Sequence, residues 1–198
     1  MKQLGRPGFK KQLKAYTALV GAVLGTSPAR AAVVSTDVDP DQTFGVGQSV
    51  DIDLNGDGID DLRVRQNGAS GGNAIVSATP LNGAALQGNQ PGNWGYPYAL
   101  AYGATISAGQ VFDVVGNAVN NTALNSYGQY GNWVGGNVDA YLGVRFDILG
   151  NTHFGWVHLE VTSAEQFILR AYAYESVDGD PILAGNQTAI RLQEFEIE

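Results

Sequence analysis

The sequence predicts an all-β protein, an antiparallel sandwich of two β-sheets with long loops rich in Gly and Asn. Three observations support this fold class. Short apolar runs alternate with polar residues at a period of two, Gly, Pro, Asn and Asp separate these runs, and no segment shows a sustained helical period with caps. A meander with one apolar face is expected to bury that face against a second sheet.

The clearest strands are expected in the C-terminal third. Residues 140–149 and 154–161 alternate apolar and polar side chains, and Gly150-Asn151-Thr152 between them favours a hairpin turn. Residues 167–174 continue the pattern, and 189–195 is a candidate for the last strand. The apolar faces are expected to carry Leu142, Val144, Phe146 and Ile148, then Val157, Leu159 and Val161, then Phe167, Leu169, Ala171 and Ala173.

The first half of the chain offers shorter strands. They are expected at 32–35, 49–54 and 62–66, with weaker candidates at 74–79 and 104–107. Between residues 67 and 137, Gly, Asn and aromatic residues dominate, which predicts long loops and short strands that cover one end of the sandwich.

Residues 1–31 have the layout of a bacterial secretory signal peptide. Basic residues come first, an apolar run of about eleven residues follows, and Ala29-Arg30-Ala31 is a small-x-small cleavage pattern. A helix that spans a bilayer needs about twenty apolar residues. We expect cleavage after Ala31 and a single secreted or cell-surface domain at 32–198 without a membrane span. The alternatives are an uncleaved anchor and an ordinary N-terminal helix.

Removal of that segment leaves a strongly acidic chain. Residues 32–198 keep five arginines, no lysine and all 19 acidic residues, so their net charge is 5 − 19 = −14. Such a surface repels nucleic acid and anionic lipids, and it attracts cations. The chain has no cysteine, which excludes disulfides and thiolate metal sites.

The strongest chemical signal is the run Asp53-Leu54-Asn55-Gly56-Asp57-Gly58-Ile59-Asp60-Asp61 between two expected strands. Calcium prefers six to eight oxygen ligands. Positions one, three, five and nine carry side-chain oxygens, the glycine at position six allows a sharp turn, and position seven offers a backbone carbonyl. The predicted Ca²⁺ ligands are therefore Asp53, Asn55, Asp57, Asp61 and the carbonyl of Ile59.

This run differs from an EF-hand, because position twelve is Val64 instead of Glu and both flanks are expected strands. A modest affinity follows, with a Kd of about 10⁻⁴–10⁻³ M. The run resembles the Asp-x-Asn-x-Asp-Gly-x-x-Asp loop of FG-GAP repeats and is similar to loops of dockerins and thrombospondin type 3 repeats. The alternative is a metal-free turn closed by its own side-chain hydrogen bonds. Acidic runs at 37–41 and 178–180 could add a ligand or form solvated turns.

A wider resemblance rests on phrases at both ends of the chain after residue 31. They are 36–41, 52–62, His153-Phe154-Gly155-Trp156-Val157-His158-Leu159-Glu160-Val161, 171–175 and 181–185. In this order they are similar to PEP-CTERM-type exported bacterial surface proteins. The resemblance implies a surface protein of unknown activity. The last seven residues, 192–198, lack the Pro-Glu-Pro sorting tail of that family, so a released or matrix-associated protein is expected.

Catalytic patterns are weaker. Gly68-Ala69-Ser70-Gly71-Gly72 matches the nucleophile elbow of hydrolases, but that motif needs a strand before it and a helix after it. His153 and His158 lie five residues apart, so they are expected on opposite faces of one strand. No pair of acids can be singled out for glycoside hydrolysis. The chain is therefore predicted not to be an enzyme.

Three functions follow from these features. The leading one is a secreted calcium-binding structural or adhesion protein of the cell surface or extracellular matrix, with surface glycans or matrix proteins as candidate partners. The second is a lectin-like carbohydrate-binding module. In it, Trp94, Tyr96, Tyr98 and Trp133 would form a stacking platform. The favoured alternative is that these aromatic residues fill a β core or pin loops. The third is a secreted hydrolase.

Overall fold

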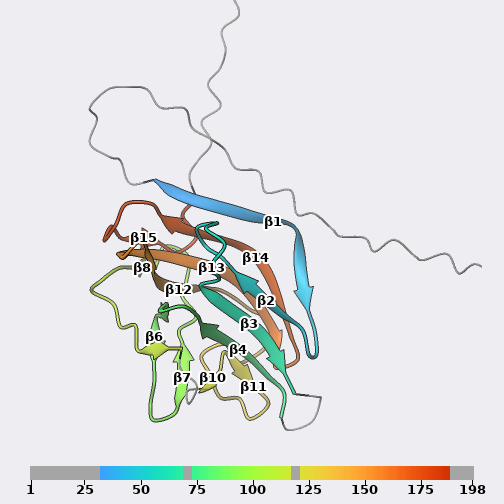
Figure 1. The fold of residues 1–198 in the computed structure, drawn as a ribbon. Coiled ribbons are helices and arrows are strands. Elements are labelled where there is room, and N and C mark those ends of the chain that lie inside the picture. The colour runs from blue at the N-terminus through green and yellow to red at the C-terminus, as the bar shows by residue number, and fades with distance from the viewer. Residues whose placement is uncertain (1–31, 69–72, 117–120, 188–198) are drawn as a thin grey trace, which may run out of the picture.

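The computed structural model describes residues 32–68, 73–116 and 121–187, and the regular structure within them is all β, as predicted (Figure 1). The strand predicted at 189–195 lies outside these residues. The described residues contain no helix long and apolar enough to cross a membrane. The strands are β1 (Val33–Phe44), β2 (Ser49–Ile52), β3 (Leu62–Asn67), β4 (Ile75–Pro80), β5 (Ala85–Leu86), β6 (Gly88–Asn89), β7 (Trp94–Pro97), β8 (Thr105–Ile106), β9 (Val114–Val115), β10 (Asn121–Thr122), β11 (Asn125–Ser126), β12 (Val138–Ile148), β13 (Asn151–Ser163), β14 (Gln166–Glu175) and β15 (Ile182–Leu183).

Two antiparallel sheets form the sandwich. A six-stranded sheet has the order β1-β14-β13-β12-β5-β9, and a four-stranded sheet has the order β11-β4-β3-β2. Strand β12 pairs with β13 along its whole length. Their turn is Leu149-Gly150, with φ angles of 53° and 84°, so Asn151 and Thr152 belong to β13 instead of to the predicted turn.

The main core lies between these two sheets. Each fully buried aliphatic or aromatic side chain contributes about 1.5–3 kcal/mol, so this layer fixes the β2–β3 hairpin firmly against the larger sheet. The alternation predicted for β12 and β13 is confirmed, because their predicted apolar faces point into this core. The core includes Ile52, Leu62, Val64, Val76 and Ala78 from the four-stranded sheet, and Leu142, Val144, Phe146, Val157, Leu159, Val161, Phe167 and Leu169 from the six-stranded sheet.

The opposite face of the six-stranded sheet is covered as well. Phe154 and Trp156 of β13 pack there in a second apolar cluster, the outer cluster. Strands β8 and β15 pair with each other and place Ile106 and Ile182 in this cluster. The six-stranded sheet is therefore the middle layer of the molecule.

A β-bulge in β14 changes which side chains face the main core. Leu159 of β13 pairs with Leu169, but His158 pairs with Ala171, so Arg170 is an additional residue in the ladder. Beyond it the alternation is reversed. The predicted face for Ala171 and Ala173 is therefore wrong: both lie in the outer cluster, while Tyr172 and Tyr174 flank the main core.

A small three-stranded sheet, β10-β7-β6, lies at one end of the sandwich, beside β11 in Figure 1. Its strands are two to four residues long and come from the Gly- and Asn-rich middle of the sequence. Trp133 is fully buried there, and its indole Nε1 donates to the carbonyl of Pro97 at 3.2 Å.

Candidate functional site

The loop 53–61, called the acidic loop below, joins the neighbouring antiparallel strands β2 and β3. The carboxylate of Asp53 accepts three backbone N–H groups, from Gly56 at 2.7 Å, Asp57 at 3.3 Å and Gly58 at 2.7 Å. Gly56 and Gly58 have φ angles of 77° and 89°, which other residues rarely adopt. The two glycines therefore allow the chain to curl around Asp53.

Further hydrogen bonds within the loop join Asn55, Asp57 and Ile59. Asn55 Nδ2 donates to Asp57 Oδ2 at 3.0 Å, and Asn55 Oδ1 accepts the N–H of Asp57 at 3.2 Å. Asp57 Oδ1 accepts the N–H of Ile59 at 2.8 Å. The side chain of Ile59 is 55% exposed, so this residue serves the loop through its backbone. The acidic loop is thus closed by its own hydrogen bonds, as the metal-free alternative expects.

Asp61 differs from the other acids of the loop because it is buried, at 7% exposure. Its Oδ2 accepts the N–H of Leu54 at 2.9 Å. Burial raises the pKa of Asp61 from 3.8 to about 6; the hydrogen bond from Leu54 opposes this rise, and the charges of Asp53, Asp57 and Asp60 add to it. The loop therefore holds a carboxylate whose negative charge is poorly compensated.

The chemistry of the acidic loop fits a hard cation. Its five predicted ligands all offer oxygen, and calcium binds oxygens of carboxylates, amides and backbone carbonyls. Asp61 is the best placed of them, since one hydrogen bond leaves most of its acceptor capacity unused. In the described part of the chain, no three acidic or histidine side chains lie together closely enough to hold a metal. A bound cation would have to draw the loop side chains closer together.

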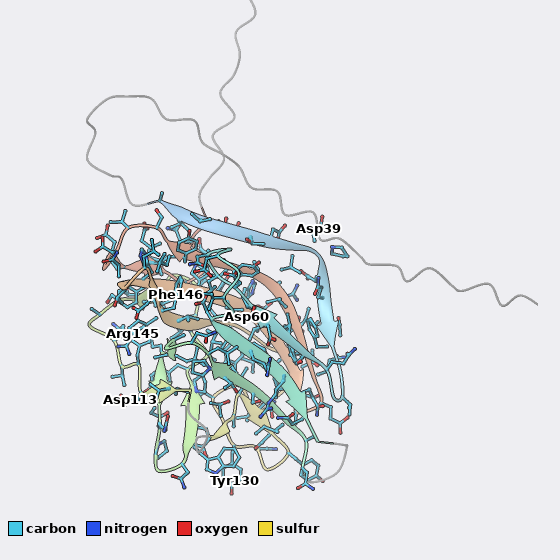
Figure 2. The ribbon with its side chains drawn as sticks, in the orientation of Figure 1. Asp39, Asp60, Asp113, Tyr130, Arg145 and Phe146 are labelled. Carbon is cyan, nitrogen blue, oxygen red and sulfur yellow. The ribbon has the colours of Figure 1, made fainter. Side chains whose placement is uncertain are left out.

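The turn between β4 and β5 is hydrogen-bonded to the end of the acidic loop. Asn82 Nδ2 donates to the carbonyl of Asp60 at 2.8 Å, and the N–H of Leu81 donates to the carbonyl of Asp61 at 2.8 Å. Asp60 is labelled in Figure 2. The role of Asn82 was missed from the sequence, where Asn82-Gly83 indicates only a turn.

The two other acidic runs belong to other elements of the fold. Run 37–41 belongs to β1 and lies where the register of β1 against β14 shifts. Arg170 Nη1 lies 2.5 Å from Asp41 Oδ2, and Arg170 Nη2 pairs with Glu160. Run 178–180 lies in the turn after β14. The structure therefore uses Asp41 in an ion-pair cluster on the six-stranded sheet.

The two histidines lie on opposite faces of β13, as predicted. The ring of His153 is buried 6.1 Å from the ring of Phe146, on the side of the main core. On the other face, His158 stacks on Tyr141 at 4.4 Å, and its Nε2 lies 2.5 Å from Asp139 Oδ1. This arrangement excludes a metal site shared by the two imidazoles.

The aromatic residues of the predicted platform separate into two groups. Trp133 is fully buried, and Tyr98 packs beside the outer cluster, so both fill the interior. Trp94 is 41% exposed and helps to line a cavity of about 310 Å³. Figure 2 shows Tyr130 of this cavity at the opposite end of the molecule from Asp39. The lining is Trp94, Tyr96, Ala123, Ser126 and Tyr130, and an adjoining hollow of about 390 Å³ adds Asn89, Pro91, Gln129, Gly131 and Asn132.

Tyr130 was missed from the sequence, because its position depends on the local fold of residues 126–131. The N–H of Tyr130 donates to Ser126 Oγ at 3.2 Å, and its carbonyl accepts the N–H of Ser126 at 3.1 Å. A Cβ atom on Gly128 would lie 2.7 Å from the Tyr130 ring, so the ring covers that glycine. Asn132 Nδ2 donates to the carbonyl of Tyr96 at 3.0 Å and ties this loop to β7.

The predicted nucleophile-elbow motif at 68–72 has no described geometry, since residues 69–72 lie outside the described residues. The described strands on either side are β3, which ends at Asn67, and β4, which begins at Ile75. No protein-family model, curated protein sequence or solved structure matches this chain.

Proposed function

We propose that this chain is a secreted calcium-binding protein with a structural or adhesive role at a bacterial cell surface or in the extracellular matrix. The all-β sandwich, the acidic chain without lysine after residue 31 and the oxygen-rich loop between β2 and β3 support this proposal. The observation that carries it is the buried carboxylate of Asp61 at the base of the acidic loop.

Calcium would act on the fold through this carboxylate. Asp53, Asp57, Asp60 and Asp61 repel one another within nine residues, and the burial of Asp61 weakens the screening of its charge by solvent. Oxygen ligands from Asp53, Asn55, Asp57, Ile59 and Asp61 would place a dication among these charges. Calcium would then stabilise the folded state, because the unfolded chain does not hold these ligands together.

Thermal melts of the exported protein in EDTA and in calcium test this proposal. At a calcium concentration of about ten times Kd, binding stabilises the fold by about 1.4 kcal/mol, or about 3–6 °C in Tm for a domain of this size. Asp57→Ala removes a predicted ligand from an exposed position and should lose most of this response. Asp113→Ala removes an exposed carboxylate elsewhere and should respond like the wild type. Equal responses in all three proteins would refute the site.

A binding role is favoured over catalysis by the described histidines. His153 Nδ1 lies 2.9 Å from the carbonyl oxygen of Glu175, and His158 stacks on Tyr141 and pairs with Asp139. A general base needs a proton of a bound substrate within reach. Both imidazoles instead have partners within the six-stranded sheet.

Carbohydrate binding is a second candidate function, favoured by the cavity at Trp94, Tyr96 and Tyr130. Aromatic rings pack against the C–H faces of sugars, while side-chain amides exchange hydrogen bonds with hydroxyl groups. Asn89, Gln129 and Asn132 supply such amides beside the rings. The lining contains no charged side chain, which suits a neutral saccharide rather than an acidic one.

The cavity is also held in shape before any ligand arrives. The hydrogen bonds between Ser126 and Tyr130, and from Asn132 to Tyr96, fix the loop that carries the Tyr130 ring. A prearranged site loses less conformational freedom when it binds. This feature distinguishes the cavity from a chance gathering of exposed aromatic side chains.

An array of neutral oligosaccharides tests this second candidate. Selective binding is expected for the wild type, and Trp94→Ala and Tyr130→Ala should abolish it. Tyr102→Ala is the matched control, since Tyr102 is an aromatic residue with 74% exposure outside the cavity. Absence of selective binding, or equal loss in the control, would leave calcium-supported structure as the function of the fold.

A further inference from the structure

Glu175, the last residue of β14, carries an enclosed carboxylate, and the residue is only 1% exposed. Its Oε1 accepts two backbone N–H groups, from Ala32 at 2.8 Å and from Val177 at 3.0 Å. The N–H of Ser176 donates to the carbonyl of Ala32 at 3.1 Å. Ala32 is thus clamped to the end of β14, directly before β1 begins to pair with that strand at Val33.

No cationic side chain of the described residues pairs with this carboxylate. Arg170, on the same strand, pairs with Asp41 and Glu160. His153 meets the backbone carbonyl of Glu175 and not its carboxylate. Burial of an ionised carboxylate is costly unless a cation or several hydrogen bonds compensate its charge. Two neutral N–H donors compensate it only in part.

Ala32 is also the first residue after the predicted cleavage site Ala29-Arg30-Ala31. Hydrolysis of the amide between Ala31 and Ala32 by a signal peptidase consumes one water, leaves a carboxylate on Ala31 and gives Ala32 a free amine. The pKa of an α-amino group is about 7.7–8.0. Near neutral pH the amine therefore takes up a proton, and the nitrogen that donated a neutral N–H to Glu175 becomes a cation.

We propose that cleavage after Ala31 creates an ion pair between the ammonium of Ala32 and the buried carboxylate of Glu175, which fastens β1 to β14 in the processed protein. The site is a receptor for the chain's own new N-terminus. Charge-assisted hydrogen bonds are roughly twice as strong as neutral ones. The proposal rests on the leader predicted as part of the proposed function and does not depend on the calcium site.

The first experiment locates the new N-terminus. The full chain with its leader is expressed in an exporting bacterium, and the first residue of the exported protein is determined by mass spectrometry. Ala32 is the expected first residue. Any other first residue overturns the ion pair and leaves the calcium melts described above unaffected, so the two proposals fail separately.

The second experiment neutralises the amine of the exported protein. Because no lysine follows residue 31, acetic anhydride leaves a stable acetyl group on the α-amino nitrogen alone among aliphatic amines. Acetylation returns Ala32 to a neutral amide, so Tm should fall by roughly 3 °C or more. In Glu175→Gln, whose side-chain oxygen can still accept both N–H groups, acetylation should change Tm by less than about 1 °C. Equal shifts in the two proteins would refute the ion pair.

The pH dependence gives a readout that a merely structural role of Glu175 would not produce. The carboxylate raises the pKa of the amine, so the advantage of unmodified over acetylated protein is complete below about pH 8 and is lost as pH rises through the raised pKa. The titratable groups beside this site are His153, whose Nδ1 meets the carbonyl oxygen of Glu175, and Tyr174, whose pKa is raised by burial; Asp178 and Asp180 follow Glu175 in the sequence. An advantage that stays constant from pH 7 to pH 10 would overturn the proposal.

Discussion

Asp61→Asn removes the buried charge of the acidic loop while its side-chain oxygen can still accept the N–H of Leu54. In the calcium-free wild type, the pKa of Asp61 is about 6 in the folded protein against 3.8 ordinarily. The folded protein therefore holds this proton more tightly than the unfolded chain. Ionisation costs nothing below about pH 3.8, and the cost is complete above about pH 6.

The size of this cost follows from the pKa. Each unit of difference between the folded and unfolded pKa of Asp61 corresponds to about 1.4 kcal/mol, so the cost of ionisation reaches about 3 kcal/mol at neutral pH. This corresponds to about 6–12 °C in Tm. The Asn amide adds a buried N–H group that can cost about 1–3 kcal/mol when unsatisfied. The slope of Tm against pH is therefore the diagnostic quantity, rather than Tm at a single pH.

Differential scanning calorimetry in EDTA, at several pH values between about 4 and 7.5, measures this slope. The wild type should lose stability as pH rises from about 4 to about 6 and level off above that, and Asp61→Asn should show a flatter profile. In calcium the wild type should behave in the opposite way, since protonation of Asp61 removes a ligand. Its calcium-dependent gain in Tm should fall as pH drops below about 6.

Parallel profiles of the two proteins in EDTA would refute the buried charge at Asp61. Matching profiles in EDTA and in calcium would instead refute its role as a ligand. Asp113→Asn serves as the control, because it removes one exposed carboxylate and should reproduce the wild-type slopes.

Three further predictions concern the fold, each measured by urea unfolding. Arg170→Ala should cost about 1–3 kcal/mol, because it leaves Asp41 and the half-buried Glu160 without their cation, and a loss no greater than that of the exposed Arg65→Ala would contradict this. Gly131→Ala should unfold more easily than Gly135→Ala, because a Cβ at Gly131 would lie 2.1 Å from the carbonyl oxygen of Leu124, whereas Gly135 has nothing within 4 Å. Trp133→Ala should cost about 3–5 kcal/mol through the cavity it leaves, and a cost under about 1 kcal/mol would show that this indole is not part of the core.

Strands β12 and β13 could be predicted closely because their alternation is long and unbroken. Leu142 and Phe146 lie in the main core together with Val157, and each occupies the face that the pattern assigned to it. The error in β14 arises from one inserted residue. Arg170 reverses the faces of all later residues, and an ion pair that depends on β1 and β13 holds it there, so the local sequence does not reveal the bulge.

The middle of the chain was less predictable, because most of its short strands pair with strands distant in sequence. Trp94 and Trp133 both follow Gly-Asn in the sequence, yet Trp94 is 41% exposed and Trp133 is fully buried. Trp133 is held by Pro97, which lies 36 residues earlier. A local pattern contains no information about such a contact, so the sequence could not show that Trp133 is buried and that Trp94 is exposed.

For the acidic loop, the sequence predicted the position of the loop but not the burial of Asp61. Its position between two adjacent strands followed from the sequence, because the flanking runs alternate and Gly56 and Gly58 permit the turn. The enclosure of Asp61 did not follow. It arises because Asp61 lies directly before Leu62, the first residue of β3, and both residues are buried in the folded protein.

Strand β1 forms an edge of the six-stranded sheet, so one side of its backbone has no neighbouring strand among the described residues. Such an edge can pair with the edge of another molecule and start aggregation. Here the ladder is interrupted between Asp37 and Gln42, a stretch that contains Pro40, which has no N–H, and the acids Asp39 and Asp41. Two copies approaching edge to edge would bring like charges together along a broken ladder. An interrupted, acidic edge of this kind is a poor template for pairing with the edge strand of another molecule.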